Sequence, residues 1–205
     1  MPNFLPGPGG FIAMLTVQFH NQPIRFEVAK FSAKRPAQFE RLKTCLLLGL
    51  KRAEEPTAQA LRMIVSGLAD LCLMNPHILI TPDLADLGNP PQNLAESGYA
   101  SVSGLGTSTP PKHRKDPRIW LAEVGGQAPP PYKEMPLPAV LNFFWHEALH
   151  LVADFSHTDV PKDMNDPNNK RWRDTMHAVA KAFPSTLYDP VLKHEVGLYA
   201  PDAWH

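Results

Sequence analysis

A chain of 205 residues can bury a core without covalent staples, and we expect one compact domain over residues 1–205 with residues 1–10 as a flexible arm. Twenty basic residues balance twenty acidic ones, so we expect binding neither to nucleic acid nor to a membrane surface. No apolar run reaches the roughly eighteen residues that span a bilayer. Residues 1–15 contain no basic segment followed by a long apolar one, so we expect no Sec-type signal. We therefore expect a cytoplasmic protein, or one exported without a cleavable signal.

The N-terminal third of the chain predicts a β-hairpin followed by two helices. Apolar and polar residues alternate from Leu15 to Val28, with a break at Asn21-Gln22-Pro23 that indicates the turn. Apolar residues then follow helical spacing over 37–53 and 57–74. Thr57 is the expected N-cap of the second helix.

The two cysteines, Cys45 and Cys72, lie within the apolar patterns of these two helices. Free thiols in the core are the favoured interpretation, and one disulfide between the helices is the alternative. Two cysteines make no disulfide framework, which favours a reducing compartment.

Three short strands are predicted in the middle of the chain, at 77–81, 98–104 and 118–124. The loops between them are rich in proline, glycine and serine. One loop contains PKHRKDP at 111–117, and a charge run of this kind is most simply a solvated loop.

The most apolar helix is predicted from Pro138 to about Phe155, and a last helix follows at 170–183. A helix that is apolar on most faces is expected to be buried. With the hairpin and the short strands, these helices predict an α+β fold.

The stretch WHEALHLVADFSH, at 145–157, places three histidines, a glutamate and an aspartate in this apolar region. His146 and His150 are four residues apart, so they share one face of a helix and can meet a single ion. Glu147 projects about 100° round from His146. The H-E-x-x-H spacing predicts a Zn²⁺ site with His146 and His150 as ligands and Glu147 as the general base. A chance match on a solvated helix is the alternative.

These residues resemble the zincin zinc metallopeptidases, in which an H-E-x-x-H helix packs beneath a small twisted β-sheet. The order of elements is similar over residues 77–183, and the likeness in sequence is specific at 146–157. The resemblance implies a zincin-like fold with further helices around the active-site helix. It also implies that the strand expected at 118–124 is the edge strand that binds an extended peptide substrate.

The third zinc ligand is left open by the sequence. The metzincin branch reads H-E-x-x-H-x-x-G-x-x-H, and the stretch here is similar with one extra residue, which makes His157 the first candidate. A straight helix would place His157 about 10 Å along the axis from His150, so the helix must break at 153–155. The other candidates are Asp174, His177, Asp154 and Glu195.

The sequence therefore predicts a zinc-dependent endopeptidase that acts on a protein or peptide substrate. Glu147 would take a proton from a zinc-activated water and pass it to the leaving amine, and Tyr188 or Tyr199 would donate to the oxyanion. The alternatives are a binding or effector module with a structural zinc, and a metal-free helical interaction domain.

Overall fold

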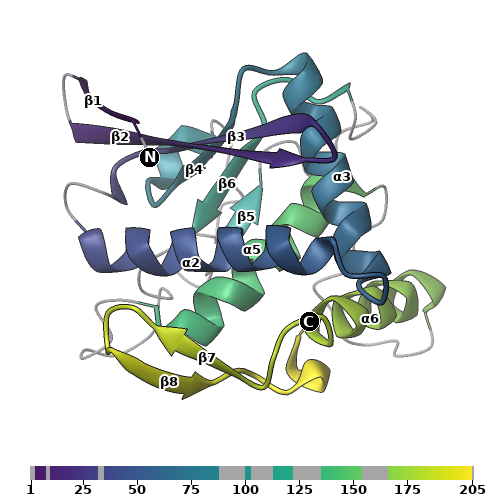
Figure 1. Ribbon diagram of the computed structural model, residues 1–205. Coiled ribbons are helices and arrows are strands. Elements are labelled where there is room, and N and C mark those ends of the chain that lie inside the picture. Colours follow the sequence, from purple (N-terminus) through teal and green to yellow (C-terminus); the bar gives the residue numbers. More distant parts are fainter. Residues whose placement is uncertain are drawn as a thin grey trace.

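The computed structural model describes residues 3–7, 10–31, 35–87, 100–102, 113–121, 135–153 and 166–204. These residues form the α+β fold expected from the sequence (Figure 1). The strands of the large sheet are β1 (Asn3–Gly7), β2 (Gly10–Phe19), β3 (Gln22–Val28), β4 (Ile78–Thr81), β5 (Ala100–Val102) and β6 (Arg118–Leu121). The helices are α2 (Pro36–Ala53), α3 (Gln59–Met74), α5 (Leu137–Val152) and α6 (Pro167–Ala180). A second hairpin consists of β7 (Thr186–Asp189) and β8 (His194–Gly197), and two short 3-10 helices are η1 (Leu84–Leu87) and η3 (Pro201–Ala203).

The described strands of the large sheet lie in the order β1-β2-β3-β4-β6-β5. Strands β3, β4 and β6 are parallel to one another, and β5 runs antiparallel to β6 at the edge. The expectation that the strand at 118–124 forms the edge is wrong, because β6 pairs with β4 on one side and with β5 on the other. The edge strand beyond β6 is therefore β5, which lies in the segment predicted at 98–104.

The predicted N-terminal hairpin is confirmed by β2 and β3, which pair in register from Ala13 opposite Val28 to Phe19 opposite Gln22. His20 and Asn21 form the two-residue turn with φ values of 47° and 65°. Positive φ at both positions is what a type I′ turn requires, and this turn matches the twist of the two strands. Residues 3–7, within the segment expected as an arm, form β1 and pair with β2.

Helices α3 and α5 pack against the sheet, and α2 packs against both of these helices. Helix α6 and the β7–β8 hairpin lie on the side of this helix layer away from the sheet (Figure 1). The inward residues of β3, Ile24, Phe26 and Val28, are at most 1% exposed and face the helices. The opposite face of the β2–β3 hairpin carries polar residues such as Thr16 and Gln18, both exposed. This alternation is the pattern of a sheet with one buried face.

The helix boundaries agree with the predictions to within about three residues: α5 ends at Val152 and not near Phe155, α6 begins and ends three residues before the predicted 170–183, and α3 begins at Gln59. Thr57 is not the cap: the N-cap position is Ala58, and no side chain accepts a hydrogen bond there. Asn75 ends α3 as expected, in an extended conformation. Among the described residues, no helix has both the length and the apolar character that crossing a membrane requires.

The prediction of free core thiols is confirmed, since Cys45 and Cys72 are both buried and unbonded to each other. Burial raises the pKa of the Cys45 thiol far above its usual range, and the nearby Asp189 carboxylate raises it further. Burial also raises the pKa of Cys72. Both thiols are therefore protonated and poorly reactive near neutral pH.

Candidate metal centre

Helix α5 places the H-E-x-x-H residues in the interior of the protein. Leu, Ala, Val and Phe side chains fill most positions of this helix, and Pro138 lies in its first turn, where a missing amide costs nothing. His146, Glu147 and His150 are 8%, 6% and 6% exposed. The helix is therefore buried and not solvated, because all three polar side chains lie in the interior.

The two imidazoles lie side by side on one face of α5, with ring centroids 5.0 Å apart. Trp172 of α6 packs across both of them. Its ring stacks on His150 at 4.0 Å and contacts His146 edge-on at 4.8 Å. Since Trp172 is itself 1% exposed, its indole restricts the orientation of both histidine rings.

The end of α5 meets the condition on which the His157 hypothesis depends. The helix ends at Val152, and Ala153 has φ −114° and ψ 152°, which is extended backbone. A helix that continued straight past Phe155 is therefore excluded. His157 and Asp154 lie outside the described residues.

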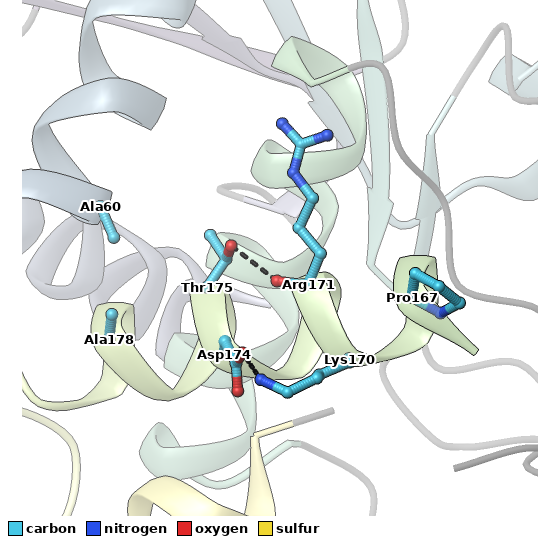
Figure 2. Close-up of a pocket in the computed structure, with 7 residues that line it drawn as sticks. All are labelled: Ala60, Pro167, Lys170, Arg171, Asp174, Thr175 and Ala178. Atoms are coloured by element: carbon cyan, nitrogen blue, oxygen red, sulfur yellow. Dashed lines mark hydrogen bonds and ion pairs between the residues drawn. The ribbon is translucent and has the colours of Figure 1, made fainter. Parts of the chain in front are cut away.

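Asp174, a competing third ligand, lies on the outer surface of α6. Its side chain is 65% exposed and pairs with the Lys170 ammonium, which lowers the pKa of the carboxyl group. Figure 2 shows both side chains at a surface cavity of about 470 Å³, which is also lined by Ala60 of α3. The tryptophan of α6 faces the histidines, and Asp174 does not share that face.

His177, the other candidate on α6, is engaged elsewhere. Its Nδ1 lies 2.9 Å from Asp202 Oδ1, and both residues line a surface cavity of about 410 Å³ near the C-terminus. Glu195 is exposed on β8. Within the described parts of the chain, no three His, Cys, Asp or Glu side chains are grouped as metal ligands, so these candidates do not join His146 and His150.

The tyrosines considered as oxyanion donors are on the C-terminal segment. Tyr188, on β7, is 50% exposed, and Tyr199, just before η3, is 41% exposed. Both residues are therefore exposed, whereas His146, Glu147 and His150 are buried.

Two residues that contact the H-E-x-x-H helix were missed by the sequence analysis. Trp172 shares a helical face with Met176 and Val179, and this apolar spacing could have indicated its burial. Arg114, in the run interpreted as a solvated loop, donates to the carbonyl oxygen atoms of His150 and Leu151. That interpretation is right for the exposed Lys115 and wrong for Arg114.

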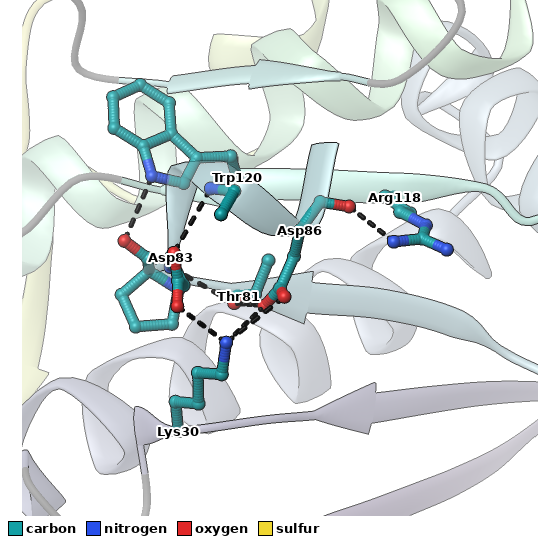
Figure 3. A network of polar contacts seen from close by, with 8 residues as sticks. Lys30, Thr81, Asp83, Asp86, Arg118 and Trp120 are labelled. Carbon is teal, nitrogen blue, oxygen red and sulfur yellow. Dashed lines mark hydrogen bonds and ion pairs between the residues drawn. The ribbon is translucent and has the colours of Figure 1, made fainter. Parts of the chain in front are cut away.

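A second polar cluster lies where β3 and β4 end, and its groups are bonded to one another (Figure 3). The Lys30 ammonium contacts Asp83 at 2.6 Å and Asp86 at 3.0 Å, and the bond to Asp83 raises the pKa of Lys30. Thr81 donates to Asp86, and Arg118 donates to the Asp86 carbonyl oxygen. The cluster therefore fastens the η1 segment to the ends of the parallel strands.

A scan against protein-family models, a search of curated proteins and a search of solved structures each found no match to this chain. The function is therefore inferred from the residues of α5 and from the elements that contact them.

Proposed function

We propose that the protein is a zinc-dependent endopeptidase of the zincin type, with His146, His150 and His157 as metal ligands and Glu147 as the general base. The observation that carries this proposal is the burial of His146, Glu147 and His150 on one helix, with the two imidazoles side by side. Two imidazoles and a carboxylate at this spacing on one buried helix are the donor set and general base of an H-E-x-x-H zinc site.

The donor set fits zinc. Two neutral imidazoles four residues apart are a common pair of zinc ligands, and zinc–nitrogen bonds are about 2.0–2.1 Å long. Ring centroids 5.0 Å apart leave both rings within reach of one ion. The end of α5 at Val152 supports His157 as the third ligand, because the chain leaves the helix axis there.

When bound, zinc supplies a Lewis acid that polarises a peptide carbonyl and makes water a nucleophile near neutral pH. Glu147 lies next to His146 on the same helix and would accept the proton of the attacking water, then deliver it to the leaving amine. The Trp172 ring excludes water from one side of the imidazoles. An extended peptide would pair with β5, which has one free edge in the sheet order of the described strands.

The Glu147→Gln variant tests this proposal. It should bind zinc as the parent does and lose at least about 10²-fold in peptide hydrolysis, because the general base is removed while its shape is kept. Zinc content is measured by native mass spectrometry, and hydrolysis with a mixture of synthetic peptides. Glu40→Gln, at an exposed position of α2, is the matched control and should behave as the parent.

A parent chain that binds no zinc would refute the metal site. A chain that binds zinc with equal hydrolysis by parent and Glu147→Gln would refute the proposed mechanism. Zinc binding without hydrolysis of any peptide would instead favour a binding module with a structural ion.

A further inference from the structure

The last turn of α5, which contains His150, is bonded to a residue from a distant loop. Arg114 Nη1 donates to the carbonyl oxygen of His150 at 2.8 Å and to that of Leu151 at 3.1 Å. Because α5 ends at Val152, these carbonyl groups belong to the last turn, where helical amides no longer serve as partners. A guanidinium group also complements the negative end of the helix dipole.

Arg114 is itself anchored at the end of α3. The amide of the buried Asn75 donates to the Arg114 carbonyl oxygen at 2.9 Å and to that of Leu71 at 2.9 Å. The Asp116 backbone N–H donates back to Asn75 Oδ1 at 3.0 Å. A continuous hydrogen-bonded path therefore runs from the last turn of α3, through Asn75 and Arg114, to the last turn of α5.

Close packing joins the same two helices near this path. A Cβ atom at Gly67 of α3 would lie 2.6 Å from the Cβ atom of Val152, so the helices approach one another with no room for a side chain at Gly67. The last turn of α5 is thus located by Gly67 through packing and by Arg114 through hydrogen bonds. The side chain of His150 is located separately, by its stacking on Trp172.

We propose that Arg114 is a positioning residue for the metal site, acting through the backbone of His150. This inference rests on the proposed zinc site. Removing the guanidinium would leave two carbonyl groups without their charged donor, so the last turn would fray and the His150 imidazole would lose its placement relative to His146. Both bonds come from one nitrogen, Nη1, so the effect depends on this donor group and not on side-chain bulk alone.

The chain contains a matched control for this experiment. Arg62 Nε donates to the carbonyl oxygen of Ala53 at 2.9 Å and its Nη2 to that of Glu55 at 2.6 Å, so it bonds to the end of α2 as Arg114 bonds to the end of α5. Arg62→Met should lower the melting temperature, because it removes hydrogen bonds to helix-end carbonyl groups, without altering metal binding. Any effect specific to Arg114 therefore separates positioning of the site from general stabilisation.

The experiment compares zinc affinity, by competition with a chelator, in the parent, Arg114→Met, Arg114→Lys and Arg62→Met. Arg114→Met should bind zinc about 10- to 100-fold more weakly, as for other residues that orient a ligand, and Arg114→Lys should recover part of that loss. Cobalt(II) bound in place of zinc should give a changed absorption spectrum in Arg114→Met and the parental spectrum in Arg62→Met, since the spectrum reports the coordination geometry.

Parental zinc affinity and an unchanged cobalt spectrum in Arg114→Met would overturn the inference while leaving the proposed function intact. A parent that binds no zinc would overturn both. If Arg114→Met does not fold, Arg114→Gln retains a neutral donor and should show an intermediate loss of affinity, and parental affinity in that variant would overturn the inference.

Discussion

At the scale of single residues, the interior of the helix layer combines histidines with aromatic rings. His150 stacks on Trp172, and His146 contacts the same indole edge-on. The ring contacts restrict rotation of both imidazoles, so the proposed zinc site would find both rings already oriented. Pre-orientation of this kind is what a metal site built on two side chains of one helix requires.

The identity of the third ligand can be tested residue by residue. His157→Ala should weaken zinc binding as severely as His150→Ala, because each removes one bond to the metal. Asp174→Ala should retain nearly parental affinity, since Asp174 is exposed and paired with Lys170. Competition with a chelator measures the zinc affinity of all three variants. If Asp174→Ala matched His150→Ala while His157→Ala bound zinc normally, the assignment of His157 would be wrong.

At the scale of elements, α2 and α5 pack closely at a glycine of α2. A Cβ atom placed on Gly49 of α2 would lie 1.9 Å from Trp145 Cζ2, far closer than any real contact. Trp145 is fully buried and directly precedes His146. Gly49 therefore allows the indole to fill the space between the two helices.

Gly49→Ala should consequently lower the free energy of unfolding by about 1–3 kcal/mol, the usual cost of overpacking a core. The loss occurs although alanine is the better helix former. Gly197→Ala is the control, because a Cβ atom there meets nothing within 4 Å. Urea denaturation measures the free energy of unfolding of both variants. Equal stability of Gly49→Ala and the parent would show that the helices separate easily at this crossing.

At the scale of the whole molecule, a buried ion pair connects the C-terminal hairpin to the helix layer. Arg41 Nε of α2 lies 3.0 Å from Asp189 Oδ2 of β7, and the two side chains are 6% and 1% exposed. Arg41 also donates to the carbonyl oxygen of Met135, just before α5. Asp189 Oδ1 accepts from the backbone N–H groups of Val191 and Leu192. One arginine therefore joins three segments that are distant in sequence.

Asp189→Asn should lower the free energy of unfolding by about 3–5 kcal/mol, because it leaves the Arg41 charge buried without its counter-charge. Asp174→Asn removes a carboxylate from an exposed pair and should leave the denaturation midpoint unchanged. Both variants are compared by urea denaturation at neutral pH. A small effect of Asp189→Asn would mean that water reaches Arg41 in the native protein.

The sequence determined those features that depend on neighbours along the chain. The spacing of apolar residues indicated α2, α3 and the β2–β3 hairpin, because each buries one face and that face repeats with the period of the element. Helix α5 was indicated by apolar residues on most of its faces, which is the pattern of a helix buried on nearly all sides. The spacing of His146, Glu147 and His150 likewise placed all three on one helix. The short β7 and β8 strands escaped prediction because their side chains are mostly exposed and show no clear alternation.

Only the tertiary structure decided the features that depend on partners far away in sequence. The interior position of β6 follows from its pairing with β4 and β5. The residue pattern of a single strand does not determine the order of the strands in a sheet. The role of Arg114 follows from the approach of its loop to the end of α5, across 36 positions of sequence. A charged side chain in a polar run has the same local pattern whether it faces water or a helix end, so long-range packing alone distinguishes the two.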